Sequence, residues 1–133
     1  MGQTTEEGIT DILDMYFTTP GDFTVRLCSD TSVAKDAVYA DLTEVTGSGY
    51  AGVPLTTITT STYSTDDTQA VGNDVDFNAT GTWIVANKWF VTRETGVSGE
   101  ADVLVCWNTL TGGATTLENG ESITVSPILI GVG

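Results

Sequence analysis

Acidic side chains are the most abundant groups in this chain that could do chemistry. The sequence holds 18 Asp and Glu residues against 4 Lys and Arg residues, and it contains no histidine. A carboxylate acid–base pair needs two groups in a cleft whose pKa values are driven apart. The closest pairs are Asp11 with Asp14, Asp66 with Asp67, and Asp74 with Asp76. They lie in polar stretches, so we interpret them as solvated charges; glycan hydrolysis by Asp74 and Asp76 is the enzymatic alternative.

Metal sites and catalytic nucleophiles have no complete motif in the sequence. Asn73, Asp74 and Asp76 offer oxygen ligands for calcium, but the DxDxDG spacing and the later glutamate are missing. The lack of histidine excludes Ser-His-Asp and Cys-His catalysis and histidine-ligated metals. There is no GxSxG, GxxxxGK[ST] or helix-opening GxGxxG, and we interpret Gly47-Ser48-Gly49 as a turn. We therefore predict that the chain is not an enzyme and uses no cofactor and no metal.

Two cysteines and three tryptophans are further candidates for chemistry or for ring stacking. Cys28 and Cys106 lie inside expected strands, and we interpret them as buried free thiols, with a disulfide as the alternative. A catalytic thiol needs a basic neighbour, which Cys106 lacks in sequence. We interpret Trp83, Trp89 and Trp107 as core or interface residues, and the alternative is a stacking platform for a sugar ring.

One amphipathic helix is predicted near the N-terminus. Thr4 and Glu7 fit a capping box, and Pro20-Gly21 ends the helical pattern. Apolar residues recur there at i, i+3, i+4, i+7 and i+8, on one face of a helix. These residues are Ile9, Ile12, Leu13, Tyr16 and Phe17. We take this stripe as the candidate interface, packed either on the chain's own β domain or on a neighbouring subunit.

After Gly21 the apolar pattern changes to period two, which is typical of strands. The stretch 23–28 predicts a strand with one buried face, and 101–107 predicts a central strand. The stretch 38–45 fits a strand or an extended arm, and 61–73 fits an exposed loop or a weak hairpin. The sequence thus predicts a mainly β fold, a β-sandwich or jelly roll of about eight antiparallel strands with one short N-terminal helix. We expect residues 1–21 to form a helical arm and 22–133 the β domain.

Length and charge narrow the possible partners. A chain of 133 residues fits one domain. Its formal net charge of −14 repels phosphates and anionic membranes, so we expect no nucleic-acid partner and no membrane partner. The N-terminus lacks the basic and apolar regions of a signal peptide, and no stretch approaches the ~20 apolar residues of a membrane span. We therefore expect synthesis in a cytoplasm.

Four stretches resemble elements of small tailed-phage virion proteins. Residues 40–56 (ADLTEVTGSGYAGVPLT) lead from an acidic stretch through a glycine turn into a strand of the form G-Y-A. The aromatic strand at 89–91, the stretch 103–110 and the ending at 117–133 (LENGESITVSPILIGVG) are similar to later elements of those proteins. The resemblance covers 23–133. Family members often carry a basic residue where this chain has Gly52.

The resemblance implies a non-enzymatic bacteriophage virion structural protein built as a β-sandwich. Our leading hypothesis is a capsid decoration (cement) protein, made in the host cytoplasm and located on the capsid surface of the virion. Its partners would be the major capsid protein and itself, as a homotrimer that bridges and stabilises capsomers. The alternative is a tail or fibre module that binds a host surface glycan through Trp83, Trp89, Tyr50 or Tyr63.

Overall fold

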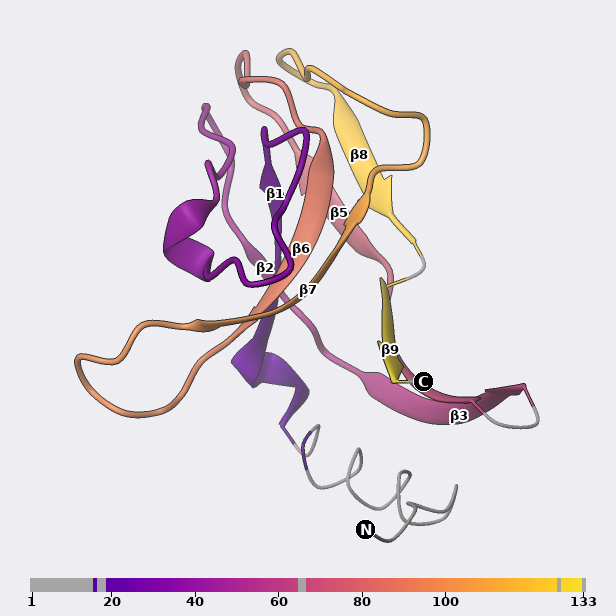
Figure 1. The fold of residues 1–133 in the computed structure, drawn as a ribbon. Helices are drawn as coiled ribbons and strands as arrows, with labels where there is room; N and C mark the ends of the chain where they lie inside the picture. Colours follow the sequence, from indigo (N-terminus) through magenta and orange to yellow (C-terminus); the bar gives the residue numbers. More distant parts are fainter. Residues whose placement is uncertain (1–15, 17–18, 65–66, 127, 133) are drawn as a thin grey trace, which may run out of the picture.

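The computed structural model describes residues 16, 19–64, 67–126 and 128–132 (Figure 1). Every described strand pair is antiparallel, and each described strand belongs to a sheet. The elements are η1 (Pro20–Asp22), β1 (Phe23–Cys28), η2 (Tyr39–Asp41), β2 (Val53–Pro54), β3 (Ile58–Ser64), β4 (Asp67–Gly72), β5 (Val75–Asn78), β6 (Lys88–Arg93), β7 (Val103–Thr109), β8 (Ser122–Val125) and β9 (Ile128–Val132), where η denotes a short 3-10 helix. The prediction of a mainly β chain with antiparallel strands is confirmed.

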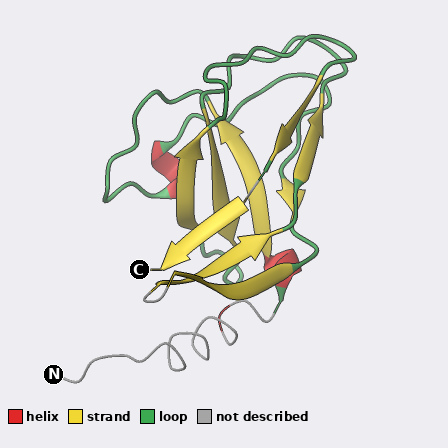
Figure 2. Ribbon diagram, turned by 90° about the vertical axis from the view of Figure 1, so that its right-hand side faces the viewer, coloured by secondary structure: helices red, strands yellow, loops and turns green. Residues whose placement is uncertain are grey.

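The strands form three sheets. The largest has the order β2-β1-β6-β7, a second has the order β3-β4-β9, and β5 pairs with β8. The three-stranded sheet runs across one end of the four-stranded sheet (Figure 2). Pro54 lies in the edge strand β2, where its missing N–H leaves no gap in a ladder.

A single core cluster takes apolar side chains from all three sheets. In the largest sheet, Val25 of β1 lies opposite Val91 of β6, and Leu27 lies opposite Trp89. These four side chains share one face because successive side chains of a strand alternate between faces. The cluster continues through residues of the other sheets and the loops, among them Leu55, Ala70, Phe77, Trp83, Val125 and Ile128.

Strand β1 is covered on both faces, so the prediction of one buried face is wrong. Thr24 and Cys28 point away from the core face and are nevertheless buried. The segment between β1 and β2 folds back over this second face: Tyr39 of η2 packs on Phe90 of β6, with ring centroids 5.7 Å apart. Phe90 is fully buried yet lies outside the core cluster, which shows that the sheet has a second, smaller buried layer.

Strand β7 lies at an edge of its sheet, so the prediction of a central strand is wrong. Its described residues pair with β6 alone. Val103 and Trp107 are each 40% exposed. An apolar run predicts burial on both faces, but it carries no information on whether a second strand pairs alongside. The two inner positions are held by β1 and β6.

The structure decides between the alternatives that the sequence left for residues 61–73 and 38–45. Residues 61–73 lie mostly in the β3–β4 hairpin rather than in a loop. Residues 38–45 form neither a full strand nor a simple arm: η2 comes first, and Glu44 then bridges to Cys28 at the end of β1. The turn at 47–49 is confirmed by a bond from the Tyr50 N–H to the Gly47 carbonyl (3.2 Å).

The predicted N-terminal helix falls almost entirely outside the described residues. Of its candidate interface residues, Ile9, Ile12, Leu13 and Phe17 lie outside them, and Tyr16 is described. Tyr16 packs edge-to-face on Phe23 with ring centroids 5.5 Å apart, and its hydroxyl accepts a hydrogen bond from Arg93 Nε (3.1 Å). Tyr16 therefore contacts the chain's own β1 and β6, and the helix itself stays a prediction.

Gly47 provides a direct test of the packing between the 47–49 turn and Trp83. The Trp83 indole N–H donates to the Ser48 carbonyl (2.7 Å), which draws the turn against the ring. A Cβ at position 47 would overlap Trp83 Cδ1 and lie 2.8 Å from Trp83 Cα. Gly47→Ala should therefore lower the free energy of unfolding by about 2 kcal/mol, as measured by urea denaturation. Gly21→Ala is the control because its Cβ would meet nothing within 4 Å; equal midpoints for the two variants would contradict the prediction.

Candidate functional site

The candidate site is built around Arg26, the one charged residue of β1. Its chain neighbours Val25 and Leu27 face the core, so the alternation of a strand directs Arg26 to the opposite, second face. A partly buried guanidinium keeps its charge and needs hydrogen-bond acceptors on all sides. The surrounding segments supply them.

Three side chains accept hydrogen bonds from the Arg26 guanidinium or neutralise its charge. Nε donates to Thr92 Oγ1 on β6 (3.0 Å), and Nη1 donates to Glu44 Oε1 (3.1 Å). Nη2 lies 3.8 Å from Asp102 Oδ2, at the end of the loop between β6 and β7. The Tyr39 ring covers the guanidinium with its centroid 5.2 Å from Cζ, a cation–π arrangement. One cation thus joins β1, β6, the η2 segment and the β6–β7 loop.

Glu44 is the central acceptor of this network. Besides Arg26 it accepts hydrogen bonds from the Tyr39 hydroxyl (2.6 Å) and from the Tyr50 hydroxyl (2.8 Å). The Tyr50 oxygen in turn accepts from the backbone N–H of Leu27 (3.0 Å). Both carboxylate oxygens of Glu44 are therefore occupied by donors within the chain.

Burial and the Glu44 charge shift the titration of the neighbouring groups. Burial, followed by the hydrogen bond to Glu44 and its charge, raises the pKa of Tyr39 to about 12. Burial raises the pKa of Tyr50 above its ordinary value by more than the hydrogen bond from Leu27 lowers it. For Arg26, burial lowers the pKa, but the hydrogen bond and charge of Glu44, together with the interactions with Tyr39 and Tyr50, outweigh burial, so the net shift is upward. At neutral pH the site thus holds neutral phenols and a charged guanidinium.

Gly52 leaves the space that the guanidinium occupies. A Cβ at this position would lie 2.7 Å from Thr24 Cγ2 and 3.0 Å from Arg26 Nη1. A larger residue would displace the Arg26 head group from its acceptors. Gly52 therefore keeps open the space beside β1 in which the Arg26 head group lies.

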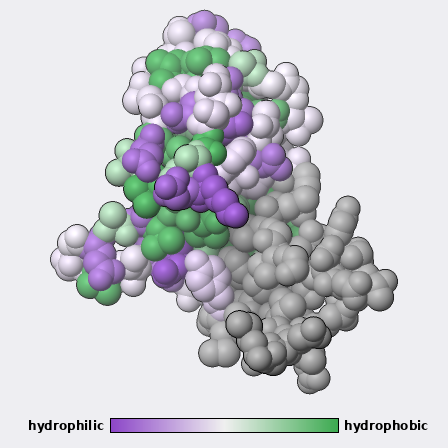
Figure 3. All heavy atoms as spheres, in the orientation of Figure 1, coloured by the Kyte–Doolittle hydropathy of each residue, from purple (hydrophilic) through white to green (hydrophobic). Residues whose placement is uncertain are grey.

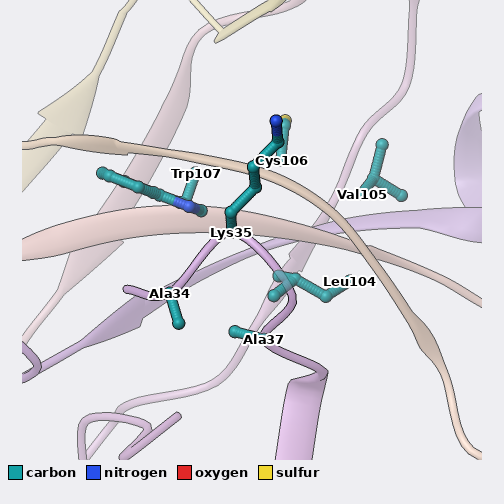
Figure 4. A pocket seen from close by; sticks show the side chains of 7 residues that line it. All are labelled: Ala34, Lys35, Ala37, Leu104, Val105, Cys106 and Trp107. Carbon is teal, nitrogen blue, oxygen red and sulfur yellow. The ribbon is translucent and has the colours of Figure 1, made fainter. Parts of the chain in front are cut away.

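Two open cavities flank the segment that covers this network. One, which we call the η2 cavity, has a volume of about 380 Å³ and mainly apolar walls. It is lined by Val38, Tyr39, Ala40, Leu42, Glu44, Ala101 and Asp102. The other, the Lys35 cavity, has a volume of about 310 Å³ and lies between residues 34–37 and β7, as Figure 4 shows. Trp107 and Cys106 are among its lining residues.

The predicted carboxylate pairs do not form a described acid–base site. Asp74 and Asp76 are exposed and accept hydrogen bonds from Ser126 (2.6 Å) and Thr124 (2.5 Å) across the β5–β8 region. The side-chain oxygen of Asn73 accepts backbone N–H bonds of Thr56 and Thr57 (2.9 and 3.1 Å). These three residues therefore act as cross-links between segments. Asp11, Asp14 and Asp66 lie outside the described residues, and the described part contains no His, Cys, Asp and Glu group placed to hold a metal.

The tryptophans divide into core and surface. Trp83 is 3% exposed and Trp89 is 5% exposed, so their interpretation as core residues is confirmed and neither can stack on an external sugar. Tyr50 is partly buried, with its hydroxyl held by Glu44. Trp107 is exposed on β7, and Lys88 Nζ lies 4.7 Å from its ring centroid. Trp107 is therefore the one tryptophan that presents its ring to the surface.

Both cysteines are free thiols in the structure, as the sequence indicates. Burial raises the pKa of Cys28 to about 11 and that of Cys106 to about 12. Thiols with such pKa values stay protonated near neutral pH and are poor nucleophiles.

The sequence interpretation missed the Arg26 network. The available signal was a lone arginine inside a strand of otherwise buried residues, because a cation there requires an acidic partner.

Comparison of the chain with protein-family models, with curated proteins and with solved structures found no match. Within the described residues, none of the helices has the length and apolarity needed to cross a membrane.

Glu44→Gln tests whether this carboxylate holds the network together. The variant leaves the part-buried Arg26 with the more distant Asp102 as its acidic neighbour, so the free energy of unfolding should fall by about 2 kcal/mol. Urea denaturation measures the change. Glu100→Gln, which removes the same charge from an exposed loop position, should change stability by less than about 0.5 kcal/mol. Equal losses in both variants would show that only net charge matters.

The raised pKa of Tyr39 predicts a loss of stability at alkaline pH. Between about pH 10 and 12 the folded state keeps the Tyr39 proton that the unfolded chain releases, so the free energy of unfolding falls as pH rises through this window. Tyr39→Phe removes this contribution and should show a shallower decline from pH 9 to 12 in denaturation measured at fixed steps of pH. A decline of the same slope in both proteins would refute it.

Proposed function

We propose that the chain is a non-enzymatic bacteriophage virion structural protein, a capsid decoration protein that bridges neighbouring capsomers from outside. In this proposal the sheets are layers of a β-sandwich of the jelly-roll type formed by residues 22–133. Residues 1–21 form a helical arm, which adds the apolar stripe described above to the interface. Copies associate as a homotrimer on the major capsid protein.

The observation that carries the proposal is the outer edge of β7, along which no described strand pairs. A strand with a neighbour on one side only presents unpaired N–H and C=O groups, which is a template for pairing with another chain. Val103 and Trp107 are exposed on β7, and Val97 is exposed in the β6–β7 loop, which projects from the sheet (Figure 1). A surface subunit of a shell would bury such an edge.

The character of the visible surface is compatible with an assembly protein. On the face drawn in Figure 3, hydrophobic residues lie between hydrophilic ones rather than in one continuous patch. Interfaces between separately stable proteins are about as apolar as the rest of a protein surface. The net charge of −14 would keep free copies soluble before they bind, and attachment outside the shell avoids the packaged nucleic acid.

The alternative is a tail or fibre module that binds a host surface glycan. The observation that favours it is Trp107, whose exposed indole lines the Lys35 cavity (Figure 4). An exposed aromatic ring beside a cavity can stack on a sugar. In this alternative Trp107 replaces Trp83 and Trp89 as the stacking side chain.

Cryo-EM of the intact virion tests the proposal, with the expected result of density for this chain on the outer capsid surface. Binding of purified protein to capsids that lack it should fall at least about tenfold in Val103→Lys, because the lysine places a charge on the interface edge. Ile84→Lys is the matched control, since Ile84 is 41% exposed and is not part of β7. Absence from the capsid surface, or equal binding by both variants, would refute the decoration role. Density in the tail, with glycan binding lost in Trp107→Ala, would establish the alternative.

A further inference from the structure

The geometry points to the η2 cavity as a receptor for a basic side chain, Arg or Lys, of the partner protein. The cavity lies between η2 and the end of the β6–β7 loop, which leads directly into the edge strand β7. The inference rests on the proposed function, because it names the chemistry by which the subunit recognises its partner.

The walls of the cavity suit the hydrocarbon part of such a side chain. Val38, Ala40, Leu42 and Ala101 line it, and Val38 is exposed to solvent. Lys and Arg bury their methylene stems against apolar surface while the charged head reaches a polar group. The volume of about 380 Å³ lies at the lower end of the range of small-ligand sites, which is about 300–1,000 Å³. One long side chain is the occupant that this size favours.

The charges around the cavity leave one negative charge without a counterion. Glu44 and Asp102 both line it, and Arg26 is the one cation that contacts them among the described residues. Two carboxylates and one guanidinium sum to −1. Glu44 has both oxygens occupied by donors, whereas Asp102 accepts no hydrogen bond within the described part of the chain. The Asp102 carboxylate is therefore the group with capacity for a further cation.

The chain's own basic residues do not supply that cation. The sequence has 4 Lys and Arg residues in total. Arg26 is in the network, Lys88 donates to Thr109, and Arg93 donates to Tyr16. Lys35 lines the other cavity. A second copy could offer Lys35 alone and would approach against a charge of −14 on each partner, so a basic surface of a different protein is the better complement.

A small cationic probe tests the site without the virion. We would titrate N-acetyl-arginine methylamide into the full-length 15N-labelled chain and follow amide chemical shifts. Shifts should concentrate at residues 38–44 and 101–102 and weaken with added salt. N-acetyl-norleucine methylamide, which keeps an apolar stem without the charge, should bind about fivefold more weakly.

Two matched variants locate the charge that matters. Asp102→Asn should weaken binding of the arginine probe about fivefold, with urea denaturation confirming that the variant is folded. Asp36→Asn, which removes the same charge from an exposed position outside the cavity, should change it less than about twofold. Equal affinity for both probes, shifts elsewhere on the chain, or unchanged binding by Asp102→Asn would overturn the inference.

Capsid binding separates this inference from the proposed function. If the wild-type chain binds capsids and Asp102→Asn binds them equally well, the basic-side-chain site is wrong and the decoration role stands. If the arginine probe binds as expected and the chain is absent from the capsid, the decoration role is wrong and the site stands. Self-association that is abolished by Lys35→Gln would identify a second copy as the occupant and overturn the choice of partner.

Discussion

Arg26 places a permanent positive charge within an inner strand of the largest sheet, and its neutralisation organises the segments around it. Glu44 and the Tyr39 ring from the η2 segment, Thr92 from β6 and Asp102 from the β6–β7 loop meet at this guanidinium. A partly buried charge without partners would cost several kcal/mol, so these segments are constrained together. The cover formed by η2 and the closeness of the β6–β7 loop both follow from this constraint.

The neutralisation of Arg26 also explains which parts of the surface around η2 and β7 stay uncovered. The segment that carries η2 folds over β1 and β6, where Tyr39 packs on Phe90, and it leaves cavities on either side. It adds no strand beside β7, whose outer edge is unpaired among the described residues. The η2 cavity, the Lys35 cavity and this edge therefore lie in one region, and a partner could contact all three.

The contacts of the four basic residues show how the excess of acidic residues should be interpreted. Three of the four contact side chains of the chain itself, namely Glu44 for Arg26, Thr109 for Lys88 and Tyr16 for Arg93. Most of the acidity is left without an internal counterion. Such a surface favours basic partners through long-range attraction and disfavours close approach of identical copies in dilute solution.

The sequence by itself determined the mainly β fold, because period-two alternation in β1 and β5, the proline in β2 and the glycine turn at 47–49 are local signals. It also indicated free thiols and core tryptophans at 83 and 89. Only the tertiary structure decided that β7 lies at an edge and that Arg26 meets Glu44 and Thr92, which are 18 and 66 residues away. Strand order and such contacts depend on how distant segments pack, and local patterns do not encode that choice.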